Sequence, residues 1–336
     1  MAMAVRRLVA GGYWVLSALL LLVSAAPGAQ PVKPPGGPTQ QDTAGRVSAE
    51  LEVFRQDLGA FRRAMGEPGV GDPDLGIWSG DPRDIYFQTL MLYERTARLL
   101  FETTGVREMV PSRPPGPVEF SDVLTLTTSA YGLLKRVMQE LNVPGIERSS
   151  WSLPSPFRGD VFKTVLSLDR QVNALLERPL NYSDVFMEVN RAVGYAARLL
   201  GHFPGAVQAP EEPSFTPGKQ PGDVYARLLA CLDILARIFA VLGVNQHALE
   251  TKPVSVGSLA PVDVFMVATL VVSQLDYLHK YLNVVKMPRE VFYSGRKFPA
   301  QVYQRAGLLQ AQLEQLARLI PLQGGASPRS ADSDHR

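Results

Sequence analysis

The sequence predicts an all-α protein of about eight helices. Three observations lead to this fold class: a short motif that recurs along the chain, an apolar stripe of helical period after each copy, and a common residue pattern where the stripe ends. Together they predict an internal repeat of about 38–40 residues, in which one helix is followed by a long Pro/Gly-rich connection. The 336 residues, of which 46% are hydrophobic, are enough to form a large core.

The recurring motif, which we call the anchor, is Asp followed by Val or Ile and then, in most copies, by an aromatic residue. Its first residues are Asp84, Asp122, Asp160, Asp184, Asp223, Asp263 and, in a seventh copy, Gln301. A proline stands two residues before four of them, at Pro82, Pro221, Pro261 and Pro299. Because proline favours the first position of a helix, the anchor side chain falls at the third position, where backbone N–H groups are free. We therefore interpret the anchors as helix caps rather than as a row of acidic ligands.

After each anchor, apolar residues recur in alternating steps of four and three, which is the stripe of an amphipathic helix. One column of this stripe contains only apolar residues: Leu99, Val137, Leu175, Leu199, Ile238, Leu278 and Leu316. Gly or Asn followed by Val then ends four copies, at residues 105, 142, 243 and 283. This pattern is typical of a left-handed helix stop. We expect helices at 82–104, 119–142, 157–177, 181–200, 221–242, 261–283 and 299–320, and one more at 45–65. The helix at 221–242 is predicted to be the most buried, with 261–283 second.

The predicted connections are long, apart from the one through Arg178, Pro179 and Leu180. The short connection requires its two helices to be antiparallel. A long, extended linker can instead run back along a helix, so that successive helices point the same way. The sequence leaves two architectures open, a solenoid-like array and a bundle with long crossover connections.

The first residues have the form of an export signal. Arg6 and Arg7 precede an uncharged apolar run, residues 13–23, and small residues follow it. The run is shorter than the roughly 20 residues that span a bilayer, which favours a cleaved signal peptide over a retained anchor. Cleavage is expected between Ala25 and Ala29. The protein is then periplasmic or secreted, and the mature chain is expected to lack a transmembrane span.

The predicted domain organisation has four parts. Residues 1–29 are the signal peptide, 30–43 a flexible linker, 44–322 the helical repeat domain and 323–336 a disordered tail. The formal charge of +2 belongs to the two signal arginines, because the chain has 34 basic and 32 acidic side chains. A neutral mature chain argues against binding to nucleic acid.

Catalytic motifs are absent from the sequence. The four histidines (His202, His247, His279 and His335) have no metal-ligand spacing, and His279 is expected to be packed in the core or at its boundary. The single cysteine, Cys231, lies in the apolar stripe and is expected to be a buried, unreactive thiol. We expect no cofactor and no metal site, and an enzyme is less favoured than a binding protein.

Two sets of residues are candidates for contact with a partner. Arginine occupies the same position after four anchors, at Arg98, Arg136, Arg198 and Arg237. They form either a ladder for an anionic partner or the solvated flank of each helix, and pairing of Glu94 with Arg98 and of Asp233 with Arg237 would favour the flank. Trp78 and Trp151 stand in the linkers, where aromatic side chains either hold a loop in place or contact a partner.

The leading hypothesis is an exported helical-repeat protein that acts as a protein-interaction or scaffold module in the cell envelope, without catalysis. The alternative is a soluble carrier or sensor domain that binds an apolar small molecule between its helices. Buried, clustered carboxylates from different repeats would instead favour an enzyme.

Overall fold

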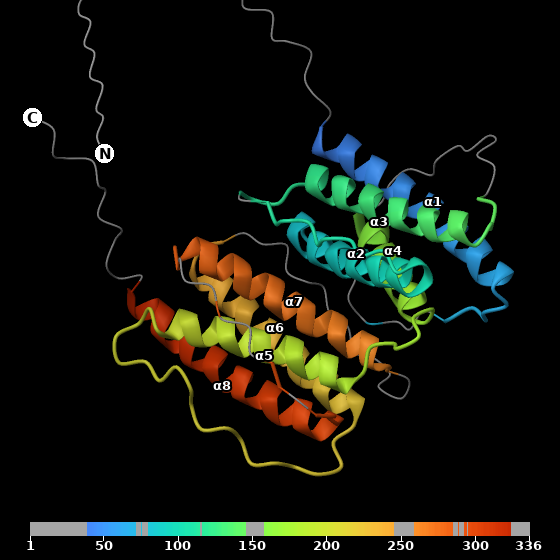
Figure 1. The fold of residues 1–336 in the computed structure, drawn as a ribbon. Helices are drawn as coiled ribbons and strands as arrows, with labels where there is room; N and C mark the ends of the chain where they lie inside the picture. Colours follow the sequence, from blue (N-terminus) through green and yellow to red (C-terminus); the bar gives the residue numbers. More distant parts are fainter. Residues whose placement is uncertain are drawn as a thin grey trace, which may run out of the picture. The chain divides into compact units, whose positions relative to one another are not determined.

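A computed structural model describes residues 39–71, 75, 80–114, 116–145, 158–244, 259–284, 288, 292–293 and 295–323, all of which belong to one compact unit, Pro38–Arg336. These residues form eight α-helices and no strand (Figure 1). The all-α prediction is therefore confirmed for this part of the chain. The helices are α1 (Gln40–Ala64), α2 (Pro82–Thr104), α3 (Phe120–Glu140), α4 (Arg158–Asn173), α5 (Tyr182–Leu200), α6 (Pro221–Val241), α7 (Pro261–Tyr281) and α8 (Pro299–Gln323).

The anchor residues cap their helices, as predicted. In six helices the anchor side chain accepts a hydrogen bond from the backbone N–H three residues earlier, over distances from 2.6 Å at Asp263 to 3.4 Å at Asp84. Each bond satisfies one of the N–H groups left free at a helix start. The side chain of Asp160 lies outside the described residues.

Helix α1 begins earlier than predicted. Thr39 is its N-cap, and the Thr39 N–H donates to Asp42 (3.0 Å) while the Asp42 N–H donates back to the Thr39 hydroxyl (3.2 Å). The prediction of a flexible linker through residue 43 is thus wrong for residues 40–43, because this reciprocal cap starts the helix there. The predicted signal peptide, residues 1–29, lies outside the described residues.

The helix ends mostly follow the predicted stops. Gly105, Asn142, Gly243 and Asn283 all have positive φ angles, between 52° and 75°. In three of the four stops, the following valine N–H bonds to a carbonyl five residues back, which is a Schellman motif. Helix α4 is shorter than predicted and ends at Asn173, whereas α8 continues to Gln323, into the predicted tail. Residues 324–336 lie outside the described residues.

The helices pack as two groups of four, which we call the first bundle (α1–α4) and the second bundle (α5–α8). In the first, α1 and α2 lie diagonally and each contacts both α3 and α4. The second has the same order, with α5 and α6 diagonal and each in contact with both α7 and α8. In a solenoid each helix would contact its neighbours in sequence, so these contacts favour a bundle with crossover connections.

Helices within a bundle point the same way. The carboxylate of Glu102, at the end of α2, accepts from the N–H of Glu177, which follows α4, and the middle of α2 is joined to the middle of α4 by Arg95 and Asp169. In the second bundle, Tyr281 at the end of α7 donates to the carbonyl of Leu242 at the end of α6 (3.2 Å). In both pairs the end of one helix contacts the end of the other, which is the arrangement of parallel helices.

Parallel neighbours require connections that return the chain to the starting end. The linker between α5 and α6 does so along α8, since its Gln208 and Pro213 carbonyls accept from Gln312 (2.8 Å) and Gln304 (2.9 Å) in reverse order. The linker between α7 and α8 returns along α5 in the same manner: the N–H of Lys297 donates to the Ser183 hydroxyl. In both cases the linker lies on a third helix of the same bundle, not on one of the two helices that it connects.

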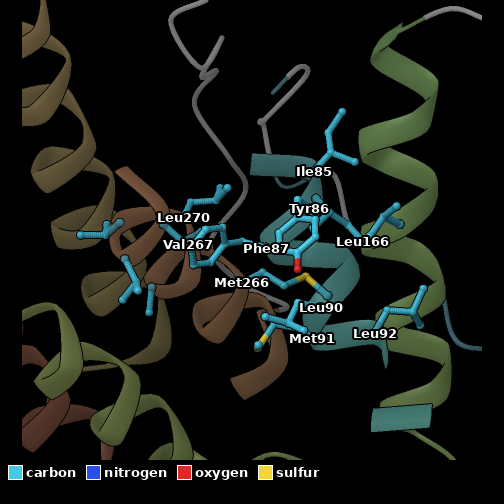
Figure 2. Close-up of a cluster of buried hydrophobic side chains, with 14 of the residues drawn as sticks. Ile85, Tyr86, Phe87, Leu90, Met91, Leu92, Leu166, Met266, Val267 and Leu270 are labelled. Carbon is cyan, nitrogen blue, oxygen red and sulfur yellow. The ribbon is translucent and has the colours of Figure 1, made fainter. Parts of the chain in front are cut away.

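The two bundles meet where α2 and α4 contact α7, an interface that we call the junction. Figure 2 shows its apolar part, in which side chains of α2, α4 and α7 form one cluster that includes Phe87, Leu166 and Met266. Helices α2 and α7 run in opposite directions at the junction. Arg83, near the start of α2, lies over the ring of Tyr277 near the end of α7 (4.3 Å), whereas the later Arg95 lies over Phe265 near the start of α7 (5.1 Å).

The junction makes α7 the most buried helix rather than α6. Sixteen of the 21 residues of α7 are buried, against ten of 21 in α6. The prediction for α6 is wrong because its outward alanines, Ala226, Ala236 and Ala240, are apolar in composition but exposed. By length and composition α7 is the one described helix that could cross a membrane, yet 83% of its apolar window is buried inside the protein.

Candidate functional site

The predicted arginine column does not form one row. Arg98 and Arg136 are exposed on α2 and α3 in the first bundle, whereas Arg198 and Arg237 lie on α5 and α6, which are diagonal to each other in the second. Arg98 pairs with Glu102 (2.9 Å) instead of the predicted Glu94. Trp78 and Trp151, the other candidates, lie outside the described residues.

His279 is buried, as expected, and its Nε2 lies 2.9 Å from the backbone oxygen of Tyr195. Burial lowers the pKa of its imidazole, so the ring favours the neutral form. His202 is exposed just after α5, and His247 and His335 lie outside the described residues. In the described part of the chain, no three His, Cys, Asp or Glu residues are grouped so that they could hold a metal ion.

We predict that Cys231 will resist alkylation in the native protein. The side chain is fully buried in α6, and burial raises the pKa of its thiol to about 12, so almost no thiolate forms at neutral pH. Iodoacetamide at pH 8 should leave the native protein unlabelled and label it after unfolding in guanidinium, as read by intact mass. Rapid labelling of the native protein would contradict the buried position.

Exposed apolar side chains gather at the end of α2 and in the linker that follows. We call this group the linker patch: Phe101, Val106, Met109 and Val110. Met109 has 88% of its surface exposed. The backbone beneath is nevertheless fixed, because the Met109 carbonyl accepts from the hydroxyl of Tyr93 (3.1 Å).

Charged residues also hold the linker patch in place. Glu108 pairs with Arg136 of α3, and the guanidinium of Arg107 lies 4.9 Å from the ring centre of Phe101. Arg98, with its partner Glu102, stands one turn before the patch on α2. Two of the four arginines predicted to contact a partner thus lie on or beside the patch.

A partly buried polar group draws its side chains from α2, α5, α7 and the linker 105–119; its members Glu188 and Asp276 are buried and the others half-buried. We call it the acid–arginine cluster: Glu94, Arg113, Glu188, Arg191 and Asp276. Arg113 of the linker donates to Asp276 of α7 (3.0 Å) and lies 3.4 Å from the Tyr195 hydroxyl of α5. That hydroxyl also donates to Asp276 (3.1 Å). The linker of the first bundle is in this way tied to two helices of the second.

The two glutamates of the cluster are less well compensated than Asp276. Glu188 is 7% exposed, its Oε1 has no hydrogen-bond partner, and its Oε2 is 3.7 Å from Arg191. Burial is the main cause that raises the pKa of Glu188, against the attraction of Arg191 and Arg113. Burial and the charge of Glu188 raise the pKa of Glu94 to about 7.

Sequence reasoning missed the acid–arginine cluster. The spacing of Glu94 and Arg98 predicts a local ion pair on the surface of α2, and nothing in the sequence relates Glu94 to Glu188. The one usable signal was Asp276, an acidic residue inside the helix at 261–283, which is predicted to be the second most buried. Such a residue is expected to be paired when it is buried.

Comparisons with known proteins add no relative. No protein-family model, no curated protein and no solved structure matches the chain.

Proposed function

We propose that the protein is an exported interaction module that binds a partner protein in the cell envelope through the linker patch, without catalysis. The observation that carries the proposal is the exposure of four apolar side chains on a fixed backbone. Exposed apolar groups on an ordered segment are typical of protein contact sites, since little conformational entropy is lost when they bind. The apolar run before residue 24 and the arginines preceding it support export.

The repeated unit predicted from the sequence belongs to the same proposal. Its support is the capping bond shared by six anchors and the common order of helix contacts in the two bundles. A repeated unit of about 38–40 residues with one helix would explain the shared capping bond, and duplication of four such units would explain the common order of contacts. The role of carrier for an apolar small molecule remains the alternative, and a lipid retained in native mass spectrometry of the mature chain would favour it.

The interaction is tested by site-specific photo-cross-linking in cells that make the full chain. A photoreactive residue at position 109 is expected to give one discrete cross-linked product, which mass spectrometry identifies as a partner protein. The matched control is position 207 in the linker after α5, where Val207 is also exposed (56%).

A charge in the patch should abolish this product. We expect Met109→Asp to remove the cross-link formed from position 106, with an unchanged thermal unfolding midpoint, because an exposed substitution affects stability little. Equal products from positions 109 and 207, or none from 109, would contradict the proposed site. Export is tested separately, by the N-terminal sequence of the mature protein.

A further inference from the structure

We propose that one end of the second bundle docks on an anionic lipid bilayer. At this end the linkers before α6 and α8 carry a group that we call the basic–aromatic end: Phe215, Phe292, Arg296, Lys297 and Phe298. Its three phenylalanines are exposed, and Phe292 has 83% of its surface in contact with solvent. The surface is separate from the linker patch, which belongs to the first bundle.

Contacts with the helices bring the two linkers to the same end of the second bundle. The N–H of Lys297 donates to the Ser183 hydroxyl at the start of α5 (3.0 Å), just before α8 begins. The ammonium of Lys219, in the other linker, lies 4.6 Å from the ring centre of Tyr303, in the second turn of α8. Phe215 stands four residues before Lys219. The exposed phenylalanines of both linkers are therefore placed near the starts of α5, α6 and α8.

Positive charge is left uncompensated at the basic–aromatic end. Neither Arg296 nor Lys297 forms an ion pair with a carboxylate of the described residues, and both lie beside aromatic rings instead. The guanidinium of Arg296 is 5.1 Å from the ring centre of Phe298, and the ammonium of Lys297 is 5.1 Å from that of Phe186. Because Arg296 and Phe298 are both exposed, a cation and an apolar ring are presented to solvent side by side.

Three carboxylates near this end are engaged within the bundle. Asp184 and Asp223 accept the capping bonds of α5 and α6, and Glu212 pairs with Arg305 of α8 (3.4 Å). The parallel helices also direct the positive ends of their dipoles toward this end. The charge that remains available to a partner is thus positive, and the complementary surface is anionic.

The order of cations and rings suits a lipid interface. In the linker before α8, two phenylalanines stand on either side of the cations, in the order Phe292, Arg296, Lys297 and Phe298. Exposed rings can enter the boundary between headgroups and acyl chains while neighbouring cations bind lipid phosphates. A protein that buried the same surface would have to compensate both cations inside the contact. The observations therefore favour a bilayer over a protein partner.

Co-sedimentation of the mature protein with lipid vesicles tests the proposal. We expect binding to phosphatidylcholine vesicles that contain about 30 mol% phosphatidylglycerol, and about tenfold weaker binding to phosphatidylcholine alone. Added salt should weaken the binding, because it screens the attraction. The double variant Arg296→Gln/Lys297→Gln should bind about twentyfold more weakly, since each cation near an anionic surface contributes about fivefold. Phe292→Ala should cost about tenfold.

Two matched variants serve as controls. Arg318→Gln, in the last turns of α8, and Met65→Ala, at the end of α1, remove an exposed cation and an exposed apolar side chain elsewhere. Both should bind vesicles like the wild type.

Four results would overturn the proposal. The first is the absence of binding to the anionic vesicles, and the second is equal binding to neutral vesicles. The third is wild-type binding by both Phe292→Ala and the double variant. The fourth is a discrete protein product, in place of lipid adducts, when a photoreactive residue at position 292 is cross-linked in cells, which would assign the surface to a protein partner.

Discussion

Replacing Asp84 by Ala is expected to lower the free energy of unfolding by about 3 kcal/mol. The side chain is fully buried and acts in two places at once. One carboxylate oxygen caps α2 at the Asp81 N–H (3.4 Å), and the other accepts from Ser273 (2.6 Å) and Gln274 (2.8 Å) of α7. The substitution removes a helix cap and two charge-assisted hydrogen bonds across the junction. Urea denaturation at pH 7, followed by circular dichroism, measures the loss.

Asp122 provides the matched control for Asp84. It occupies the same anchor position in α3 and accepts the same capping bond, from the N–H of Glu119 (2.9 Å), but no described partner in the second bundle reaches it. Asp122→Ala should therefore cost only about 1 kcal/mol, the value of a cap. Equal losses in the two variants would mean that the polar contacts across the junction contribute nothing to stability.

The helices could be predicted because their signals are local. A proline, an anchor carboxylate and a glycine or asparagine stop act within a few residues, so they determine where a helix begins and ends whatever packs against it. The start of α1 was not predicted because its capping residue, Asp42, is followed by Thr and Ala and so does not match the anchor motif. The capping pattern from Thr39 to Asp42 was nevertheless present in the sequence.

Which helices pack against each other could be predicted less well. The residues on the helix face opposite the apolar stripe do, however, indicate whether that face is buried. In α3 the outward positions hold Thr125 and Ser129, which are exposed. The matching positions of α7 hold Met266 and Leu270, which are buried at the junction. Comparing the residues that lie at equal distance from the anchor in different helices thus distinguishes a helix with one buried face from a helix with two.

The candidate sites depend on distant contacts, which explains why the sequence found only part of them. Arg98 and Arg136 were predicted as contact residues and do lie beside the linker patch. Val106, Met109 and Val110 of the patch follow the predicted helix stop and have no period by which they could be recognised. The acid–arginine cluster joins residues from four segments, and no spacing rule connects them.

Replacing Arg95 by Met is expected to cost about 3–4 kcal/mol at pH 7.5. Arg95 of α2 pairs with Asp169 of α4, and both side chains are almost completely buried. The pair itself need not stabilise the fold much, since burial outweighs the arginine and raises the pKa of Asp169 to about 6. Loss of the arginine, however, leaves the carboxylate with no compensating charge. Urea denaturation of wild type and variant measures the difference.

Two comparisons separate this cost from a simple loss of packing. Below pH 6 the difference between wild type and Arg95→Met should shrink, because Asp169 is then protonated in both proteins and the ion pair is lost in the wild type as well. The double variant Arg95→Met/Asp169→Leu should be more stable than Arg95→Met, since no buried charge remains. Arg98→Met, one position in the predicted column, should change stability by less than about 0.5 kcal/mol, because the Arg98 side chain is exposed and solvent screens its pair with Glu102. A cost for Arg95→Met that stayed constant with pH and persisted in the double variant would assign the effect to packing against Phe265 and not to the charge of Asp169.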